Sequence, residues 1–113
     1  MRVEAPIKVD RKTKRLAKRL TGGEIAVINH MDIDEVAANS LVEGKEKLVI
    51  NAAQSISGNY QNKGPGILTD KNILIIDNVG QELFDELKEG QKIDVHNGQI
   101  HKDRQLYGEG SDL

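Results

Sequence analysis

The chain has 113 residues, which fits one domain, and its formal net charge at neutral pH is −2. It contains no cysteine, which excludes disulfides and thiolate metal sites, and no apolar run approaches the roughly 20 residues of a membrane-spanning helix. The N-terminus lacks the apolar stretch of a signal peptide, so a soluble, cytoplasmic domain is expected.

The small net charge hides an asymmetry along the chain. Residues 1–20 carry a formal charge of +6 and the remainder carries −8. We interpret residues 1–22 as a basic N-terminal arm that contains a short helix ended by Gly22-Gly23. Such an arm indicates either an anionic partner or docking onto acidic surface of the same protein. Nucleic acid is disfavoured as that partner, because the chain has only three aromatic residues and lacks the Gly-rich features of nucleic-acid modules.

The later elements follow from hydrophobic spacing and turn chemistry. Asp32, with Glu35 three residues on, is expected to cap a helix whose inward face holds Ile33, Val36, Ala37 and Leu41. The pair Asn97-Gly98 is the strongest local signal and predicts a two-residue hairpin turn. The full order is a strand at 24–30, a helix at 32–44, a strand at 47–53, a short helix at 65–71, a strand at 73–77, a helix at 80–90 and a hairpin at 92–102.

Strands that alternate with helices predict a single small α/β domain, over residues 23–102, with a central mixed and partly parallel sheet. The strand at 73–77 is apolar throughout, so we expect it to be covered on both faces. Residues 103–113 are polar and rich in glycine, and are expected to begin a linker to a further region of a longer protein.

The long polar loop "NAAQSISGNYQNKGPG" (51–66) is the main candidate site. It leaves the sheet where parallel strands end, at the rim where α/β domains bind ligands. Hydroxyl and N–H groups there, a lysine and the helix that Pro65 opens could hold a phosphate or carboxylate. The alternative is that the loop's polar groups satisfy one another and cap that helix. The residues expected to contact a ligand or partner are Asn51, Ser55, Ser57, Gly58, Tyr60, Asn62, Lys63, Gly64, Asp77, Asn78, Arg11 and Lys12.

Tyr60 is expected to anchor a partner, or else to lie back over the core. Asp77 could act as a metal ligand or general base, but an Asp at a strand end more often accepts backbone N–H bonds. The acidic group around Asp32 is explained by a helix start without any cation. The three histidines, His30, His96 and His101, fit no zinc spacing. We therefore predict no catalytic residue, no metal and no cofactor in this chain.

Four segments carry a resemblance to a known family. They are "VDRKTKRLAKRL", "GEIAVINHMDIDEVAANSLVE", "VINAAQSISGNYQNKGPGIL" and "ILIIDNVG". Together they resemble the N-terminal region of the SteA family of bacterial cytokinetic-ring proteins, over about 9–100. The resemblance implies the first part of a longer cytoplasmic protein with a role in cell division. In that family the next domain is similar to thiamin pyrophosphokinase, and a C-terminal hydrophobic segment tethers the protein to the membrane.

A looser resemblance concerns the fold. The order of elements is similar to that of the swivelling phosphohistidine domain of phosphoenolpyruvate-utilising enzymes. In that domain a histidine at the start of the short helix carries the phosphoryl group. Here Lys63-Gly64-Pro65 occupies the corresponding place, so that phosphoryl transfer does not carry over.

These observations favour a non-catalytic regulatory or interaction domain of a division-associated protein. Its loop 54–65 would contact a phosphorylated ligand, a division-machinery protein or the companion kinase-like domain. The alternative is a part of a phosphotransferase that supplies residues to a composite active site. Nucleic-acid binding by the basic arm is a third reading, and it predicts strong salt dependence.

Overall fold

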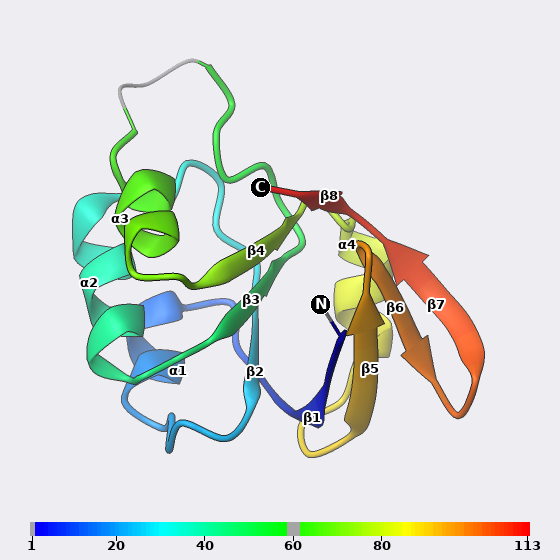
Figure 1. The fold of residues 1–113 in the computed structure, drawn as a ribbon. Helices are drawn as coiled ribbons and strands as arrows, with labels where there is room; N and C mark the ends of the chain where they lie inside the picture. The colour runs from blue at the N-terminus through cyan, green and yellow to red at the C-terminus, as the bar shows by residue number, and fades with distance from the viewer. Residues whose placement is uncertain (1, 59–61) are drawn as a thin grey trace.

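The computed structural model describes residues 2–58 and 62–113 (Figure 1). The helices are α1 (Thr13–Ala17), α2 (Glu35–Glu43), α3 (Gly64–Asp70) and α4 (Gln81–Glu86). The strands are β1 (Arg2–Val9), β2 (Ile25–Ile28), β3 (Leu48–Asn51), β4 (Leu74–Asp77), β5 (Lys92–His96), β6 (Gln99–Lys102), β7 (Gln105–Glu109) and β8 (Ser111–Asp112). The prediction of a small α/β domain with a mixed, partly parallel sheet is confirmed.

The sheet has the order β7-β6-β5-β1-β2-β3-β4-β8. Strands β1 to β4 run parallel to one another, whereas β5, β6, β7 and β8 pair antiparallel. Only Gly110 separates β7 from β8, although these strands stand at opposite ends of the order. The sheet therefore curls until its two ends approach one another (Figure 1). A Cβ on Gly110 would lie 2.3 Å from the carbonyl oxygen of Asp77, so glycine is required at this junction.

Two hydrophobic clusters fill the two sides of the parallel strands. The cluster inside the curled sheet includes Ile50, Ile76 and Phe84, and α4 covers it. The other lies between the parallel strands and helices α1, α2 and α3, and includes Leu41 and Ile75. Ile75 and Ile76 thus face opposite clusters, which confirms that β4 is covered on both faces. In the described ranges no helix is long and apolar enough to cross a bilayer.

The N-terminal segment differs from the expected basic arm. Residues 2–9 form the central strand β1, and the helix is confined to Thr13–Ala17. The sequence "RVEAPIKV" alternates polar and apolar residues, which is a strand pattern that its basic residues obscure. Pro6 sits where β1 changes partner, since residues 2–6 pair with β5 and residues 7–9 with β2. A residue without an N–H is tolerated at such a change of partner.

The C-terminal segment also differs from expectation. Residues 105–109 form β7 on β6, and residues 111–112 form β8 on β4, where a linker was expected from residue 103. Both are edge strands with exposed polar side chains, so their composition resembles that of a linker.

The hairpin prediction is confirmed, because β5 and β6 flank Asn97 and Gly98, whose φ angles of 52° and 76° suit a primed turn. The expected cap of α2 is wrong. Asp34, not Asp32, accepts the N–H of Ala37 at 2.7 Å, so the helix begins two residues later. Ile33, Ala37 and Leu41 are buried as expected, but Val36 is 56% exposed and Ala38 is buried instead.

Candidate functional site

Polar residues from the ends of β3 and β4 meet at the carboxyl rim of the parallel strands. The Asn51 amide nitrogen donates to Ser55 Oγ at 2.8 Å, and the Ser55 N–H donates to Asp77 Oδ1 at 2.8 Å. Asn51 and Ser55 are fully buried, and Asp77 is 8% exposed. Asp77 thus accepts a backbone N–H, which is the non-catalytic role that the sequence left open. These three residues fix the base of the loop.

The Asn51 side chain also holds the chain after β2. Its Oδ1 accepts the N–H of His30 at 3.0 Å, and its Nδ2 donates to the carbonyl of His30 at 2.9 Å. The same Oδ1 accepts the N–H of Ala53 at 3.1 Å. A fully buried amide with both ends satisfied is a rigid connector. The backbone of His30 is therefore tied to the base of the loop.

Asp32 organises the next part of the loop. Ser57 donates to Asp32 through its N–H and through its hydroxyl, each at 2.7 Å. These hydrogen bonds, with a smaller contribution from Asn62, hold the pKa of Asp32 below its ordinary value. Asp32 is thus a loop anchor, and its left-handed φ of 55° ends the turn before α2.

The far end of the loop returns to the same anchor points. Asn62 donates to the carbonyl of Ser55 and accepts the N–H of Gly64 at 3.3 Å. The N–H of Gly64 also reaches the carbonyl of Ile33 at 3.1 Å, and a Cβ on Gly64 would lie 2.1 Å from that oxygen. Glycine is required there, because α3 starts in contact with the backbone before α2.

Most of the predicted loop residues therefore form hydrogen bonds within the rim, which is the alternative in which the loop's polar groups satisfy one another. Gly58 and Asn78 take the left-handed backbone, with φ angles of 88° and 56°, and Lys63 is the N-cap residue of α3. Tyr60 lies outside the described residues. Figure 1 shows the described parts of the segment between β3 and α3 projecting from the body. Ile56, in this segment, is 53% exposed.

A cavity of about 640 Å³ opens beside this rim, at the carboxyl ends of β1 and β2. We call it the rim pocket. It is lined by Arg11, Lys12, Thr13, Lys14, Asn29, His30, Met31, Asp34, Val36 and Ala37. Arg11 and Lys12, two of the predicted contact residues, thus lie beside His30, whose backbone the buried Asn51 holds.

The basic residues near the rim pocket fall into two groups. Arg15 and Arg19 are bound to Asp10, and Arg19 also pairs with Glu89. The hydrogen bond from Arg15 holds the pKa of Asp10 at about 2. By contrast, Arg11, Lys12 and Lys14 make no ion pair with any described residue, and all three are exposed. The pocket therefore presents three cations that form no ion pair with a described carboxylate.

From the sequence, His30 was considered only as one of three histidines that fit no zinc spacing. In the structure it lines the rim pocket, and its Nδ1 lies 2.8 Å from the Thr13 hydroxyl. Thr13 and His30 lie 17 residues apart, in the segments that follow β1 and β2. Their positions after two neighbouring parallel strands are the only sequence signal that could have paired them.

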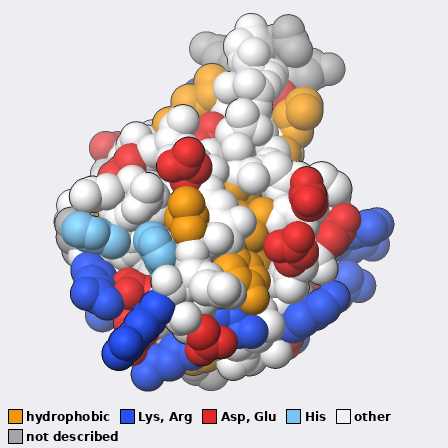
Figure 2. Space-filling model, turned by 90° about the vertical axis from the view of Figure 1, so that its right-hand side faces the viewer, with side chains coloured by type: hydrophobic (Ala, Val, Ile, Leu, Met, Phe, Trp, Pro, Cys, Tyr) orange, Lys and Arg blue, Asp and Glu red, His pale blue; other side chains and the backbone are white. Residues whose placement is uncertain are grey.

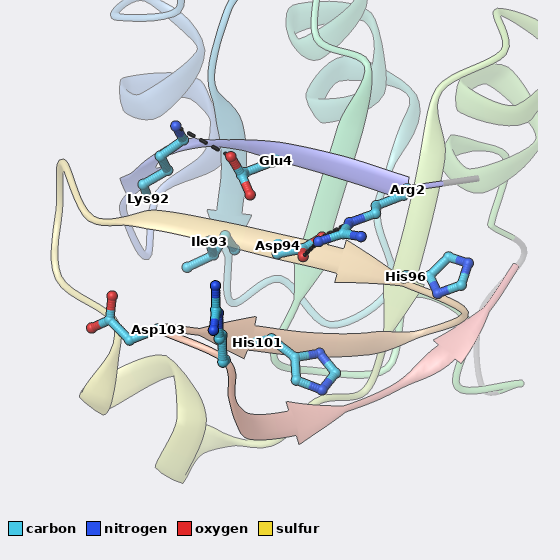
Figure 3. A pocket seen from close by; sticks show the side chains of 9 residues that line it. Arg2, Glu4, Lys92, Ile93, Asp94, His96, His101 and Asp103 are labelled. Carbon is cyan, nitrogen blue, oxygen red and sulfur yellow. Dashed lines mark hydrogen bonds and ion pairs between the residues drawn. The ribbon is translucent and has the colours of Figure 1, made fainter.

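A second cavity, of about 590 Å³, lies on the outer face of β1, β5 and β6 (Figure 3). Arg2 pairs there with Asp94, and Lys92 with Glu4. His96 and His101 line the same cavity, and Figure 2 shows histidine side chains beside Lys and Arg on this side of the molecule. Because most of its cations are already paired, this face is a weaker candidate. Across the described ranges, no group of three or more His, Cys, Asp or Glu side chains could hold a metal ion.

Comparison with known proteins gives no match: none to a protein-family model, none to a curated protein and none to a solved structure. The resemblances to the SteA family and to the swivelling phosphohistidine domain therefore stay predictions.

Proposed function

We propose that this chain is a non-catalytic binding domain that holds an anionic, phosphate-bearing ligand in the rim pocket. The observation that carries the proposal is the set of three exposed cations, Arg11, Lys12 and Lys14, without a described ion-pair partner in one cavity. Among the described lining residues Asp34 is the only carboxylate, and one of its oxygens already caps α2. The pocket thus has an excess of positive charge, which an anionic ligand would offset.

The rest of the rim supports binding rather than catalysis. Asp77 accepts the N–H of Ser55, and the Ser57 hydroxyl donates to Asp32. Asp77 and Ser57, which could have acted as base and nucleophile in a composite phosphotransferase site, are thus engaged in holding the loop. A fixed loop base also keeps His30 and the pocket wall in one position, which lowers the entropic cost of binding.

A second candidate function is docking of a protein partner on loop 54–65. Ile56 is 53% exposed on a segment whose two ends are anchored to Asp32, Asn51 and Ile33. An exposed apolar side chain on an anchored, projecting segment suits contact with a companion domain. The sequence resemblance supports a kinase-like companion and a role in bacterial division, and the swivelling-domain resemblance supports a domain that moves against its neighbour.

Thermal unfolding against a panel of phosphate-bearing metabolites tests the first proposal. A ligand at about 100 times its Kd should add roughly 2.7 kcal/mol, a shift of roughly 10 °C for a domain of this size. The double variant R11Q/K12Q should lose most of that shift. The control K47Q/K71Q removes the same charge from exposed positions outside the pocket and should keep it.

If both double variants lose the thermal shift equally, the shift depends only on the protein's net charge, and the rim pocket is not the binding site. The docking candidate has its own variant, I56S. This change should weaken association with a companion domain while leaving the phosphate-dependent shift intact, since Ile56 is outside the pocket lining.

A further inference from the structure

We infer that the ligand of the rim pocket is a small phosphate monoester with an apolar or aromatic body. Its phosphate is bound by the Nε2–H of His30 beside Arg11 and Lys12, and its body lies on Met31 and Val36. This inference rests on the proposed function and adds a recognition residue and a chemical class to it.

His30 is held from two sides. The Asn51 side chain fixes its backbone through hydrogen bonds of 3.0 and 2.9 Å, and the Thr13 hydroxyl contacts its Nδ1 at 2.8 Å. Asn51 is fully buried and Thr13 is 3% exposed, so neither support is free to move away. An imidazole positioned in this way forms a hydrogen bond to a ligand with little loss of side-chain entropy.

The contact with Thr13 engages Nδ1 of His30 and leaves the other ring nitrogen, Nε2, for a ligand. A hydroxyl both donates and accepts, so Thr13 can donate to Nδ1 of neutral imidazole or accept from Nδ1–H of imidazolium. Thr13 can also accept from the neutral tautomer protonated on Nδ1, in which Nε2 carries a lone pair, but in the two states named first Nε2 carries a proton. Among the described residues no hydrogen bond engages Nε2 of His30. A phosphate oxygen in the pocket selects these states, because it accepts from Nε2–H and repels a lone pair there.

The same pocket offers apolar surface next to its cations. Met31 is 60% exposed and Val36 is 56% exposed, and both line the cavity. They are among five large hydrophobic side chains exposed in the described part of the chain. Exposed hydrophobic side chains are normally scattered singly over a protein surface, whereas Met31 and Val36 lie in one cavity. Methionine adapts its shape to a flat ring or a branched chain, so the ligand's body packs against Met31 and Val36.

The charges around the pocket set the ligand's charge. Arg11, Lys12 and Lys14 face one lining carboxylate, Asp34, which leaves an excess of two positive charges. A phosphate monoester at neutral pH carries between one and two negative charges. An uncharged apolar ligand would leave the three cations unpaired, and inorganic phosphate would leave Met31 and Val36 uncovered.

Isothermal titration of the chain with phenyl phosphate, inorganic phosphate and phenol tests this inference. Phenyl phosphate should bind at least several-fold more tightly than inorganic phosphate, and phenol should not bind measurably. The variant H30L should weaken both phosphates at least tenfold, as expected for a lost hydrogen bond to a charged group. H30Q, whose amide retains a donor, should recover part of the loss. The control H96L, on the outer face of β5, should bind like the wild type.

The double variant M31S/V36S alters only exposed side chains and should reduce phenyl phosphate to the affinity of inorganic phosphate. Wild-type affinity in H30L, with R11Q/K12Q still impaired, would overturn the role of His30 and leave the proposed function standing. Equal affinity for the two phosphates in the wild type would overturn the ligand class. Much tighter binding of a phosphotyrosine peptide than of phenyl phosphate would overturn the small-molecule assignment. No binding of any phosphate would remove the proposed function itself.

Discussion

The Glu46→Gln substitution should stabilise the protein above neutral pH. Glu46 is 4% exposed at the amino end of β3, and its Oε1 accepts the N–H groups of Lys47 and Leu48. Its Oε2 is buried and has no hydrogen-bond partner among the described residues. Burial is the main cause that raises the pKa of Glu46 from 4.5 to about 7, and the nearby charge of Glu24 adds to it.

Because the pKa of Glu46 is raised in the folded protein, the protein loses stability as the pH rises. Below about pH 4.5 the Glu46 carboxyl is protonated in both the folded and the unfolded state, so it costs nothing. As the pH rises to about 7 the unfolded chain loses the proton while the folded protein keeps it, and stability falls. The difference between 4.5 and about 7, at about 1.36 kcal/mol per pH unit, amounts to about 3 kcal/mol. E46Q removes this loss because the amide does not ionise.

Urea unfolding followed by far-UV circular dichroism measures this effect, which suits a chain without tryptophan. The free energy of unfolding of E46Q minus that of the wild type should rise between about pH 5 and pH 8.5, by about 3 kcal/mol. Taking the difference cancels the titration of other groups. The control E43Q removes an exposed carboxylate at the end of α2 and should change stability by less than about 0.5 kcal/mol throughout. A difference curve for E46Q that is flat or falls with pH would refute the reasoning.

Two further substitutions probe the rim. N51A should lower the free energy of unfolding, measured with urea, by about 2–4 kcal/mol. The reason is that it leaves the polar groups of His30 and the hydroxyl of Ser55 without their buried partner. A loss below about 1 kcal/mol would mean that the Asn51 side chain is dispensable as a connector. G64A should lower the free energy of unfolding by more than about 2 kcal/mol, because its Cβ would meet the carbonyl of Ile33 at 2.1 Å. The control G66A, in the same helix, has nothing within 4 Å of its Cβ and should be neutral or slightly stabilising. Equal losses in the two variants would contradict the close approach of Gly64 to Ile33.

The parts of the fold that local chemistry determines could be predicted from the sequence. Asn97-Gly98 allows the two positive φ angles that the β5–β6 hairpin needs, and that turn formed as expected. The apolar strands β2, β3 and β4 were equally clear, because buried parallel strands are apolar on both faces. Strand β1 was missed because Arg2, Glu4 and Lys8 alternate with apolar residues in a segment dominated by its basic charge.

Strands β7 and β8 could not be recognised locally. Each pairs on one side only and exposes polar side chains, so the pairing partner decides the structure. The same holds for the site. The meeting of Asn51 with Asp77 at one rim follows from parallel topology, but the contact of Thr13 with His30 depends on how the start of α1 approaches the segment after β2. Periodicity cannot show such a contact. Nor could the sequence tell which cations stay unpaired, since that depends on Asp10 reaching Arg15 and Arg19.

Titration of the isotopically labelled protein with inorganic phosphate, followed by backbone amide NMR, tests the central claim most directly. Binding in the rim pocket predicts saturable shifts at residues 11–14 and 29–31, with the β5–β6 hairpin unaffected, and their loss in R11Q/K12Q. Shifts centred on His96 and His101, or no saturable shift at residues 11–14, would contradict the assignment of the rim pocket as the anion site.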